Sequence, residues 1–366
     1  MKLAVICRPF SFHGGVETAT AGLIGELLRR GHEIDLLSTR GQGAMPGVKV
    51  RTLPTLQQPS VLRFLSFALA ARRAIAGGGY DIVQSHERGL RQDIYRAGEG
   101  THRGYLAAMG RRGARVSPYH QVVWAVEKRI FSLRYARHVV AISRAGKEEI
   151  ERLYATPAER VSLVYNGVDL QRFHPEQRAR FGGASRDALG LGRESWVIVF
   201  VGSGFERKGL GPLLEGMGRL RNPECRLVVA GKGDARPYQN LARQLGIADR
   251  VRFTGPRRDV ERLYAAADVV ALPALYEPFG NVHLEALASG LPVLTSVRAG
   301  GAEVITSGRT GWVVSEPAGG AIAEGLLALH DGDRAALAQR ARASAEPFTY
   351  AAQADGFEAI YRDLKR

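Results

Sequence analysis

An arginine and a lysine, Arg207 and Lys208, stand side by side directly after the apolar, β-branched run at 196–203. That run has the composition of a buried parallel strand, so the pair falls where a strand turns into a helix. An arginine makes a two-pronged contact with phosphate oxygens, and a lysine adds a compact positive charge. A diphosphate is therefore the ligand that this turn would hold best. The alternative, a solvated surface dipeptide, is disfavoured by the position at a strand end.

Two carboxylates, Glu277 and Glu285, stand eight residues apart around the predicted start of another helix. Glu277 falls in the loop after a predicted strand at 268–274, and Glu285 falls two turns into the helix. Pro278 suits a helix start, where the backbone N–H groups of residues 279–281 would be free to donate. A glutamate near an apolar helix face needs a polar partner, which sugar and ribose hydroxyls would provide. Spacing alone leaves two exposed acids as an equal alternative.

A third candidate loop, residues 11–17, contains Gly14 and Gly15 and follows the first predicted strand. Glycines let a ligand approach the backbone closely, and the start of a helix favours an anion. A plain turn is an equal alternative for this loop. The loop lacks the G-x-G-x-x-G spacing, which argues against a nicotinamide cofactor.

The elements that must position these loops are short β-branched runs that alternate with helical patterns. The predicted strands are residues 2–7, 32–39, 81–86, 137–143 and 162–167 in one series, and 196–203, 225–231, 250–255, 268–274, 291–296 and 311–314 in a second. This alternation predicts an α/β protein with two Rossmann-like, doubly wound domains. Ligands bind beyond the carboxyl ends of parallel strands, where the candidate loops fall.

Length and composition exclude several classes of protein. A chain of 366 residues predicts about two domains. Hydrophobic residues make up 45% and charged residues 24%, which argues against disorder and collagen-like repeats. The two cysteines, Cys7 and Cys225, fall in apolar runs and are expected to be buried, reduced thiols. With no signal peptide or membrane-spanning run, these features predict a cytoplasmic protein.

The net charge of +15 is concentrated in the first half, where residues 1–170 hold 25 basic and 14 acidic side chains. Residues 103–137 contain eight Lys or Arg and one Glu among large apolar side chains. That mixture suits an anionic membrane surface or a polyanion, and a solvated helix face is an equal alternative. We expect peripheral binding to the inner face of the plasma membrane, with Trp124, Phe131 and Tyr135 entering the headgroup layer. The basic residues of this surface would be Arg111, Arg112, Arg115, Lys128 and Arg129.

Taken together, these motifs make the sequence resemble the retaining glycosyltransferases of family GT4, whose two-domain architecture is called GT-B. The motifs are the Gly14-Gly15 loop, the run from Asn166 to Asp169, the segment from Gly202 to Gly209 and the E-x7-E pattern of Glu277 and Glu285. GSGFERKG and residues 93–105 look like the branch that glucosylates the lipopolysaccharide core. The resemblance implies two domains that face a cleft. They would be residues 1–170 with 350–366 on the acceptor side and residues 171–349 on the donor side.

The resemblance also implies a role for each matching residue. Arg207 and Lys208 would hold the donor diphosphate and do the work of a metal, so neither a metal ion nor a cofactor is expected. Glu285 would bind ribose hydroxyls, and Glu277 would bind the donor sugar. Further donor contacts would come from Gly14, Gly15, Gly202, Phe279, Gly280 and Asn281, and the base would meet the loop that contains Arg258. Uracil is the favoured base, so the expected donor is a UDP-sugar.

Retention of the anomeric configuration in this family is explained without a protein nucleophile. The acceptor attacks from the face that the phosphate leaves, and the phosphate accepts its proton. Arg207, Lys208 and Glu277 would support this step, assisted by a group of the first domain. Glu99 is favoured for that group, and His86 and His102 are the other candidates. The acceptor would be a glycan or a lipid-linked glycan such as the lipopolysaccharide core.

Two other functions stay open at this point. One is a UDP-sugar epimerase of the same fold. The other is a non-enzymatic polyanion-binding protein, suggested by the isoelectric point near 10.2. Polyanion binding accounts for the charge but not for an Arg-Lys turn and an E-x7-E pair at strand ends. We therefore expect no nucleic-acid partner.

Overall fold

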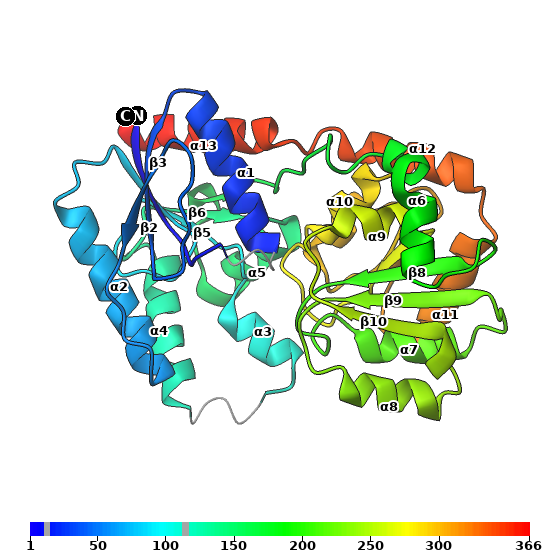
Figure 1. The fold of residues 1–366 in the computed structure, drawn as a ribbon. Coiled ribbons are helices and arrows are strands. Elements are labelled where there is room, and N and C mark those ends of the chain that lie inside the picture. Colours follow the sequence, from blue (N-terminus) through cyan, green and yellow to red (C-terminus); the bar gives the residue numbers. More distant parts are fainter. Residues whose placement is uncertain (11–14, 112–116) are drawn as a thin grey trace. The chain divides into compact units, whose positions relative to one another are not determined.

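The structure is a computed structural model that describes residues 1–10, 15–111 and 117–366. The described chain divides into two compact units, each built on one parallel sheet (Figure 1). Of the described residues, the first unit contains 1–10, 16–111, 117–167 and 350–366, and the second contains residue 15 and residues 168–349.

Seven parallel strands form the sheet of the first unit in the order β3-β2-β1-β4-β5-β6-β7. The strands are β1 (Lys2–Ile6), β2 (Glu33–Ser38), β3 (Val48–Thr52), β4 (Ile82–Ser85), β5 (Ile94–Arg96), β6 (His138–Ala141) and β7 (Val161–Leu163). The register pairs Leu3 of β1 with Ile34 on one side and Ile82 on the other. The apolar side chains of β1 therefore lie at the centre of the core.

Helices cover this sheet and include the last helix of the chain. They are α1 (Gly15–Arg29), α2 (Ser60–Ala76), α3 (His102–Ala108), α4 (Pro118–Phe131), α5 (Arg144–Tyr154), the short η2 (Ala158–Arg160) and α13 (Tyr350–Lys365). Phe357 and Tyr361 of α13 are fully buried against β1 and α1. The ribbons of α1 and α13 lie side by side (Figure 1). Arg30 follows α1 and pairs with Asp355 and Glu358 of α13 at 2.7 and 3.0 Å, which joins the two helices.

Six parallel strands form the sheet of the second unit in the order β10-β9-β8-β11-β12-β13. The strands are β8 (Trp196–Val201), β9 (Cys225–Ala230), β10 (Val251–Gly255), β11 (Val269–Leu272), β12 (Val293–Ser296) and β13 (Gly311–Val314). The helices are α6 (Glu176–Ala188), α7 (Leu210–Gly218), α8 (Arg236–Gln244), α9 (Val260–Ala266), α10 (Val282–Ala288), α11 (Gly319–His330) and α12 (Arg334–Ala345), with η3 (Ala248–Arg250) and η4 (Gly300–Val304). Because β8 and β11 are neighbours, the loops that follow them meet at one edge.

The predicted α/β fold with two parallel sheets is confirmed, and every predicted strand is present to within a few residues. The sequence prediction missed β3 and β5. Both cysteines are free and buried, as expected. Burial raises the pKa of both thiols, that of Cys225 to about 12. In the part of the chain that the structure describes, no helix has the length and apolar character needed to cross a membrane.

Candidate active site

Arg207, Lys208 and Glu277 meet at the carboxyl edge of the second sheet. Arg207 and Lys208 lie between β8 and α7, and Glu277 lies in the loop between β11 and α10. The Glu277 Oε2 atom is 2.9 Å from Arg207 Nη1 and 3.2 Å from Lys208 Nζ. Arg207 Nη1 also donates to the carbonyl of Tyr276 at 2.8 Å. Two cations and one carboxylate leave the group with one positive charge in excess, as suits an anionic ligand.

Glycine is required at two positions around this group. A Cβ on Gly202 would lie 2.4 Å from Lys208 Cδ, so the bare backbone gives room for the lysine stem. A Cβ on Gly209 would lie 1.9 Å from the carbonyl oxygen of Pro273, so α7 can start close to the end of β11. Both residues also have positive φ, which L side chains rarely adopt. Gly202 therefore leaves space for the Lys208 side chain, and Gly209 allows the close approach of α7 to the end of β11.

The Glu277 carboxylate is held in its charged form. Burial alone would raise its pKa, but Lys208 and Arg207 outweigh burial and lower the pKa to about 2. Its backbone is fixed by Glu277 N–H donating to Arg298 O at 3.2 Å and by Gly300 N–H donating to Glu277 O at 2.7 Å. At neutral pH Glu277 can therefore accept hydrogen bonds from hydroxyl groups but cannot donate one.

Glu285 is a buried carboxylate on α10 whose oxygen Oε2 accepts a hydrogen bond from Tyr264 at 2.8 Å. Burial raises its pKa, although Tyr264 and the charges of Arg172 and Lys208 oppose that rise. A buried carboxylate with one protein donor has capacity for further donors. Glu285 can therefore bind a polyhydroxyl ligand such as a ribose.

The segment that joins Glu277 to α10 is tightly built. Gly280 has φ of 82°, and a Cβ there would lie 2.8 Å from His283 Nδ1. Phe279 is fully buried, and its carbonyl accepts from Gly301 N–H at 2.8 Å. His283 is buried between Gly280 O and Thr295 Oγ1, and burial lowers its pKa to about 4. Asn281, also buried, directly precedes α10. The neutral His283 thus fixes the backbone on which the predicted sugar contacts lie.

Arg258 lies in the loop after β10, and its side chain is exposed. Its carbonyl accepts a hydrogen bond from Arg172 Nη2 at 2.7 Å, and the Arg172 guanidinium also pairs with Glu261. Arg172 therefore fixes the backbone of this loop, through which the predicted base contact would be made. The sequence reasoning did not find Arg172, because a residue 86 positions away gives no local signal.

A network of charges lies at the carboxyl edge of the first sheet, and sequence reasoning identified only Glu99 from it. Arg8 follows β1, Glu87 and Arg88 follow β4, and Glu99 follows β5. Arg8 contacts Glu87 at 2.7 Å and Glu99 at 2.5 Å, and Arg88 contacts Glu99 at 3.1 Å. Burial alone would raise the pKa of Glu99, but Arg8 and Arg88 outweigh it and the net shift is downward. The sequence did contain a signal for this network, because charged residues follow each of the neighbouring strands β1, β4 and β5.

Glu127 anchors this network from α4. It is fully buried, contacts Arg88 Nη2 at 3.0 Å and accepts from the backbone N–H of His102 at 2.8 Å. Tyr154 donates to its second oxygen. Arg88 and Glu127 are 39 positions apart in the sequence. Glu127 was not predicted to pair with Arg88, because it falls in the basic segment 103–137.

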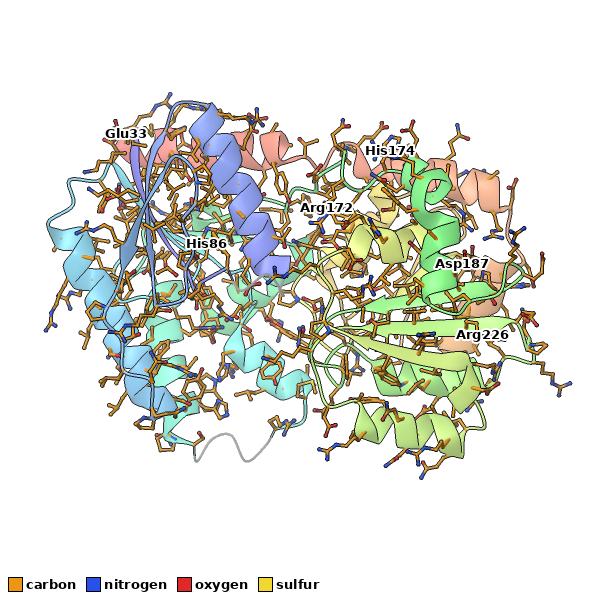
Figure 2. The ribbon with its side chains drawn as sticks, in the orientation of Figure 1. Glu33, His86, Arg172, His174, Asp187 and Arg226 are labelled. Carbon is orange, nitrogen blue, oxygen red and sulfur yellow. The ribbon has the colours of Figure 1, made fainter. Side chains whose placement is uncertain are left out.

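His86 and His102 differ in how their ring nitrogens are used. His86, labelled in Figure 2, is buried. Its Nδ1 lies 2.8 Å from Thr20 Oγ1, and its Nε2 lies 2.7 Å from Gln84 Nε2. Both nitrogens of His86 are therefore occupied, which favours a structural role. His102 begins α3, and its Nε2 is 2.8 Å from His120 Nδ1. Burial and Arg88 lower the pKa of His102 to about 4, so its ring is neutral at pH 7.

Family profiles cover both halves of the chain. The profile described as "Glycosyl transferases group 1" matches residues 183–345, and "Glycosyltransferase Family 4" matches residues 13–172. An uncharacterized glycosyltransferase of Methanocaldococcus jannaschii is 30% identical over 335 residues, 83% of each chain. A D-inositol 3-phosphate glycosyltransferase of Xylanimonas cellulosilytica is 31% identical and covers 92% of this chain and 88% of its own. The chain belongs to glycosyltransferase family GT4.

Solved structures show that this glycosyltransferase has the GT-B fold. WaaG, a glycosyltransferase involved in lipopolysaccharide biosynthesis, superposes with a TM-score of 0.88 at 24% identity and covers 99% of both chains. Anabaena HepE, solved in complex with UDP-glucose, superposes with a TM-score of 0.78 at 19% identity, over 99% of this chain and all of its own. At identities of 24% and 19%, this similarity is evidence for the fold alone.

The predicted membrane surface of the glycosyltransferase is only partly exposed. Arg111, Lys128 and Arg129 are exposed and Trp124 is half-buried. The prediction for Phe131 is wrong, because its ring is fully buried between Tyr95 and Tyr154. Gly14, Arg112 and Arg115 lie outside the described residues, and Gly15 is described only as the first residue of α1. Among the residues that are described, no three His, Cys, Asp or Glu side chains gather as metal ligands would.

Proposed function

We propose that this GT4 enzyme moves a hexose from a UDP-sugar to a glycan or lipid-linked glycan, retaining the anomeric configuration and requiring no divalent metal. The observation that carries the proposal is the Arg207, Lys208 and Glu277 group at the edge of the second sheet. UDP is favoured because HepE, of the same fold, binds UDP-glucose. The lipopolysaccharide core is the candidate acceptor, since WaaG acts in lipopolysaccharide biosynthesis.

The two cations would exchange partners when the donor binds. Both cations contact Glu277 in the structure, so they are oriented toward one point. A diphosphate can accept from Arg207 and Lys208 together, and this frees Glu277 to accept from hydroxyls of the sugar. Glu285 would accept from the ribose, with Tyr264 fixing its orientation. Once the donor is bound, charges held in this way stabilise the leaving diphosphate without further reorganisation.

Retention follows if the acceptor hydroxyl attacks from the face that the diphosphate leaves. The C–O bond to the acceptor forms as the C–O bond to the phosphate breaks, and the acceptor proton passes to the departing phosphate oxygen. Arg207 and Lys208 take up the negative charge on that phosphate. Glu99 is ionised between two arginines, so it can orient an acceptor hydroxyl by accepting its hydrogen bond.

A panel of nucleotide sugars with a lipid-linked acceptor tests this function, with mass spectrometry and proton NMR of the product. We expect one hexose to be added from a UDP-sugar with the donor's anomeric configuration. A new UDP-sugar formed without acceptor would instead identify an epimerase. Failure to bind any nucleotide sugar, together with salt-sensitive DNA binding, would support the polyanion-binding alternative.

The first prediction is that chelators leave the rate unchanged. Arg207 and Lys208 supply two positive charges at the phosphate position, the charge that a divalent ion supplies elsewhere. Initial rates measured with excess EDTA and with added Mg²⁺ or Mn²⁺ should agree within twofold. A rate abolished by EDTA and restored by manganese would contradict the metal-free mechanism.

The second prediction concerns membrane binding through the end of α4. Lys128 and Arg129 are exposed there, and each basic residue near an anionic surface contributes about 1 kcal/mol. Replacing both by glutamine should therefore weaken co-sedimentation with phosphatidylglycerol vesicles by about 30-fold at low salt. The control replaces Arg219 and Arg221, which are exposed on the second unit. Equal loss in both double variants would show non-specific charge attraction, and no loss in either would leave these residues outside the membrane contact.

A further inference from the structure

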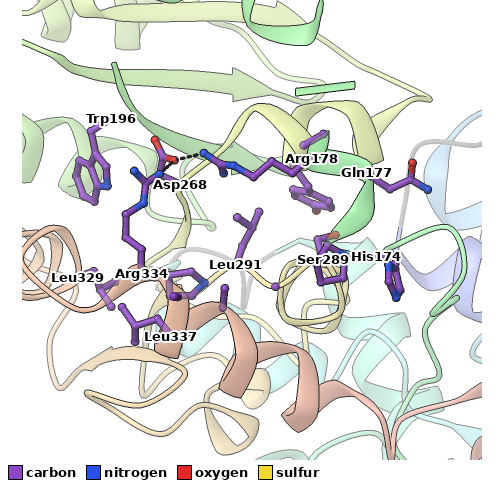
Figure 3. A pocket seen from close by; sticks show the side chains of 17 residues that line it. His174, Gln177, Arg178, Trp196, Asp268, Ser289, Leu291, Leu329, Arg334 and Leu337 are labelled. Carbon is purple, nitrogen blue, oxygen red and sulfur yellow. Dashed lines mark hydrogen bonds and ion pairs between the residues drawn. The ribbon is translucent and has the colours of Figure 1, made fainter. Parts of the chain in front are cut away.

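A cavity of about 360 Å³ lies in the second unit at the amino-terminal edge of the sheet (Figure 3). It is lined by Trp196, which begins β8, by Asp268, which precedes β11, and by Pro292, which precedes β12. Because all strands of this sheet are parallel, the cavity is at the opposite edge from Arg207 and Glu277. It is therefore a separate place from the proposed donor site.

Asp268 is the polar centre of the cavity wall, and three arginines converge on it. Its side chain is 1% exposed and accepts from Arg178 at 2.8 Å, from Arg186 at 3.0 Å and from Arg334. The backbone N–H of Val197 donates to it as well, at 2.8 Å. Figure 3 shows the Arg178 and Arg334 side chains reaching Asp268 from two sides. One carboxylate thus faces three guanidinium groups.

The three arginines are not equivalent. Arg186 is largely buried and donates to the carbonyls of Ala266, Arg193 and Ser195, so it is the structural counter-ion of Asp268. Arg178 and Arg334 have side chains that are 45% and 59% exposed, and both line the cavity. Within the described chain, Asp268 is the sole carboxylate in an ion pair with either of them. Two positive charges of this cluster are therefore left uncompensated.

The rest of the cavity is mainly apolar. Leu291, Leu329 and Leu337 form part of its wall, and Trp196 contributes an aromatic ring. Small-molecule sites are typically concave and apolar, with a few polar groups that fix the orientation of the ligand. The smallest of them have volumes of about 300 Å³. Guanidinium pairs match phosphate oxygens in geometry and charge.

We propose that this cavity binds a small organic phosphate ester. The phosphate would lie between Arg178 and Arg334, and the organic part would lie against Trp196 and the leucines. Inorganic phosphate would satisfy the charge but leave the apolar wall unused, so the ester binds more tightly. A neutral molecule of the same shape would leave the excess positive charge of Arg178 and Arg334 uncompensated, so it binds more weakly than the ester.

Calorimetry with phenyl phosphate tests this proposal, since the probe carries both a planar ring and a phosphate. Inorganic phosphate and benzyl alcohol serve as comparison ligands. We expect phenyl phosphate to bind the parent at least tenfold more tightly than either comparison ligand. Arg334→Gln and Arg178→Gln should each weaken binding by tenfold or more. The control is Arg340→Gln, on the same helix as Arg334 but outside the cavity lining, which should bind as the parent does.

Either of two calorimetric results would overturn the proposal. Unchanged affinity in both cavity variants would show that the ester binds elsewhere, and loss of binding in Lys208→Met would identify the donor site as that place. Equal affinity for inorganic phosphate would remove the role of the apolar wall. If the cavity variants fail to fold, a crystal of the parent protein soaked in phenyl phosphate would show whether the ester binds in the cavity. Density between Arg178 and Arg334 supports the site, and an empty cavity contradicts it.

Discussion

Replacing Lys208 by methionine is expected to lower kcat by about 100- to 1,000-fold, the usual cost of removing one donor aimed at developing charge. Lys208 is mostly buried and lies 3.2 Å from Glu277, so its charge is already aimed at the proposed phosphate position. Methionine keeps most of the stem that passes Gly202 while removing the ammonium. Steady-state release of UDP from the donor sugar in the presence of acceptor measures the effect.

The matched control is Arg219→Met, which removes an exposed charge at the end of α7 and should leave the rate unchanged. The variant also changes Glu277, because Lys208 is the largest of the influences that lower its pKa. That pKa should rise from its value of about 2, so any acid-side loss of activity moves to higher pH in the variant. A variant rate within threefold of the parent would remove Lys208 from the chemical step.

Replacing Glu285 by glutamine is expected to weaken UDP binding and to stabilise the unliganded protein. Loss of a hydrogen bond to a charged group costs about 1.5–3 kcal/mol, so the dissociation constant for UDP should rise by about 10- to 150-fold. Burial raises the pKa of Glu285, and a carboxyl with a raised pKa in the folded state lowers stability as pH rises through that pKa. The variant removes this cost at pH 7, so its Tm without ligand should increase.

These opposite changes separate a ligand role from a structural one. Calorimetry gives the dissociation constant, and thermal unfolding with and without UDP gives the two Tm values. Glu324→Gln, on the exposed side of α11, is the control and should alter neither quantity. A lower Tm with unchanged UDP affinity would mean that Glu285 acts only through Tyr264 in the core.

Much of the fold could be predicted because its strands are apolar runs buried on both faces. β3 was missed because it alternates valine with Lys49 and Arg51 at the sheet edge, where only one face is shielded. β5 was missed because it has only three residues, too few for any period to be visible. Neither omission moves the proposed donor site, which depends on β8 and β11.

The meeting of Arg207, Lys208 and Glu277 was predictable because the carboxyl ends of neighbouring parallel strands lie at one edge of the sheet. The charged network around Arg8 and Arg88 was not, because its ion pairs join residues 79 and 91 positions apart. His86 looked like a candidate only because it ends a strand, and its hydrogen bonds to Thr20 and Gln84 are set by packing. Phe131 shows the same limit, since an aromatic residue among arginines can face the core as well as a membrane.

A crystal structure of the enzyme with UDP would show directly whether Arg207 and Lys208 bind the donor. We expect a diphosphate within hydrogen-bond distance of Arg207 and Lys208, with a ribose hydroxyl on Glu285 and the base at the loop that contains Arg258. Glu277 should have lost at least one of its two cation contacts to the phosphate. UDP bound away from this edge of the sheet, with the Glu277 contacts intact, would contradict the proposed donor site.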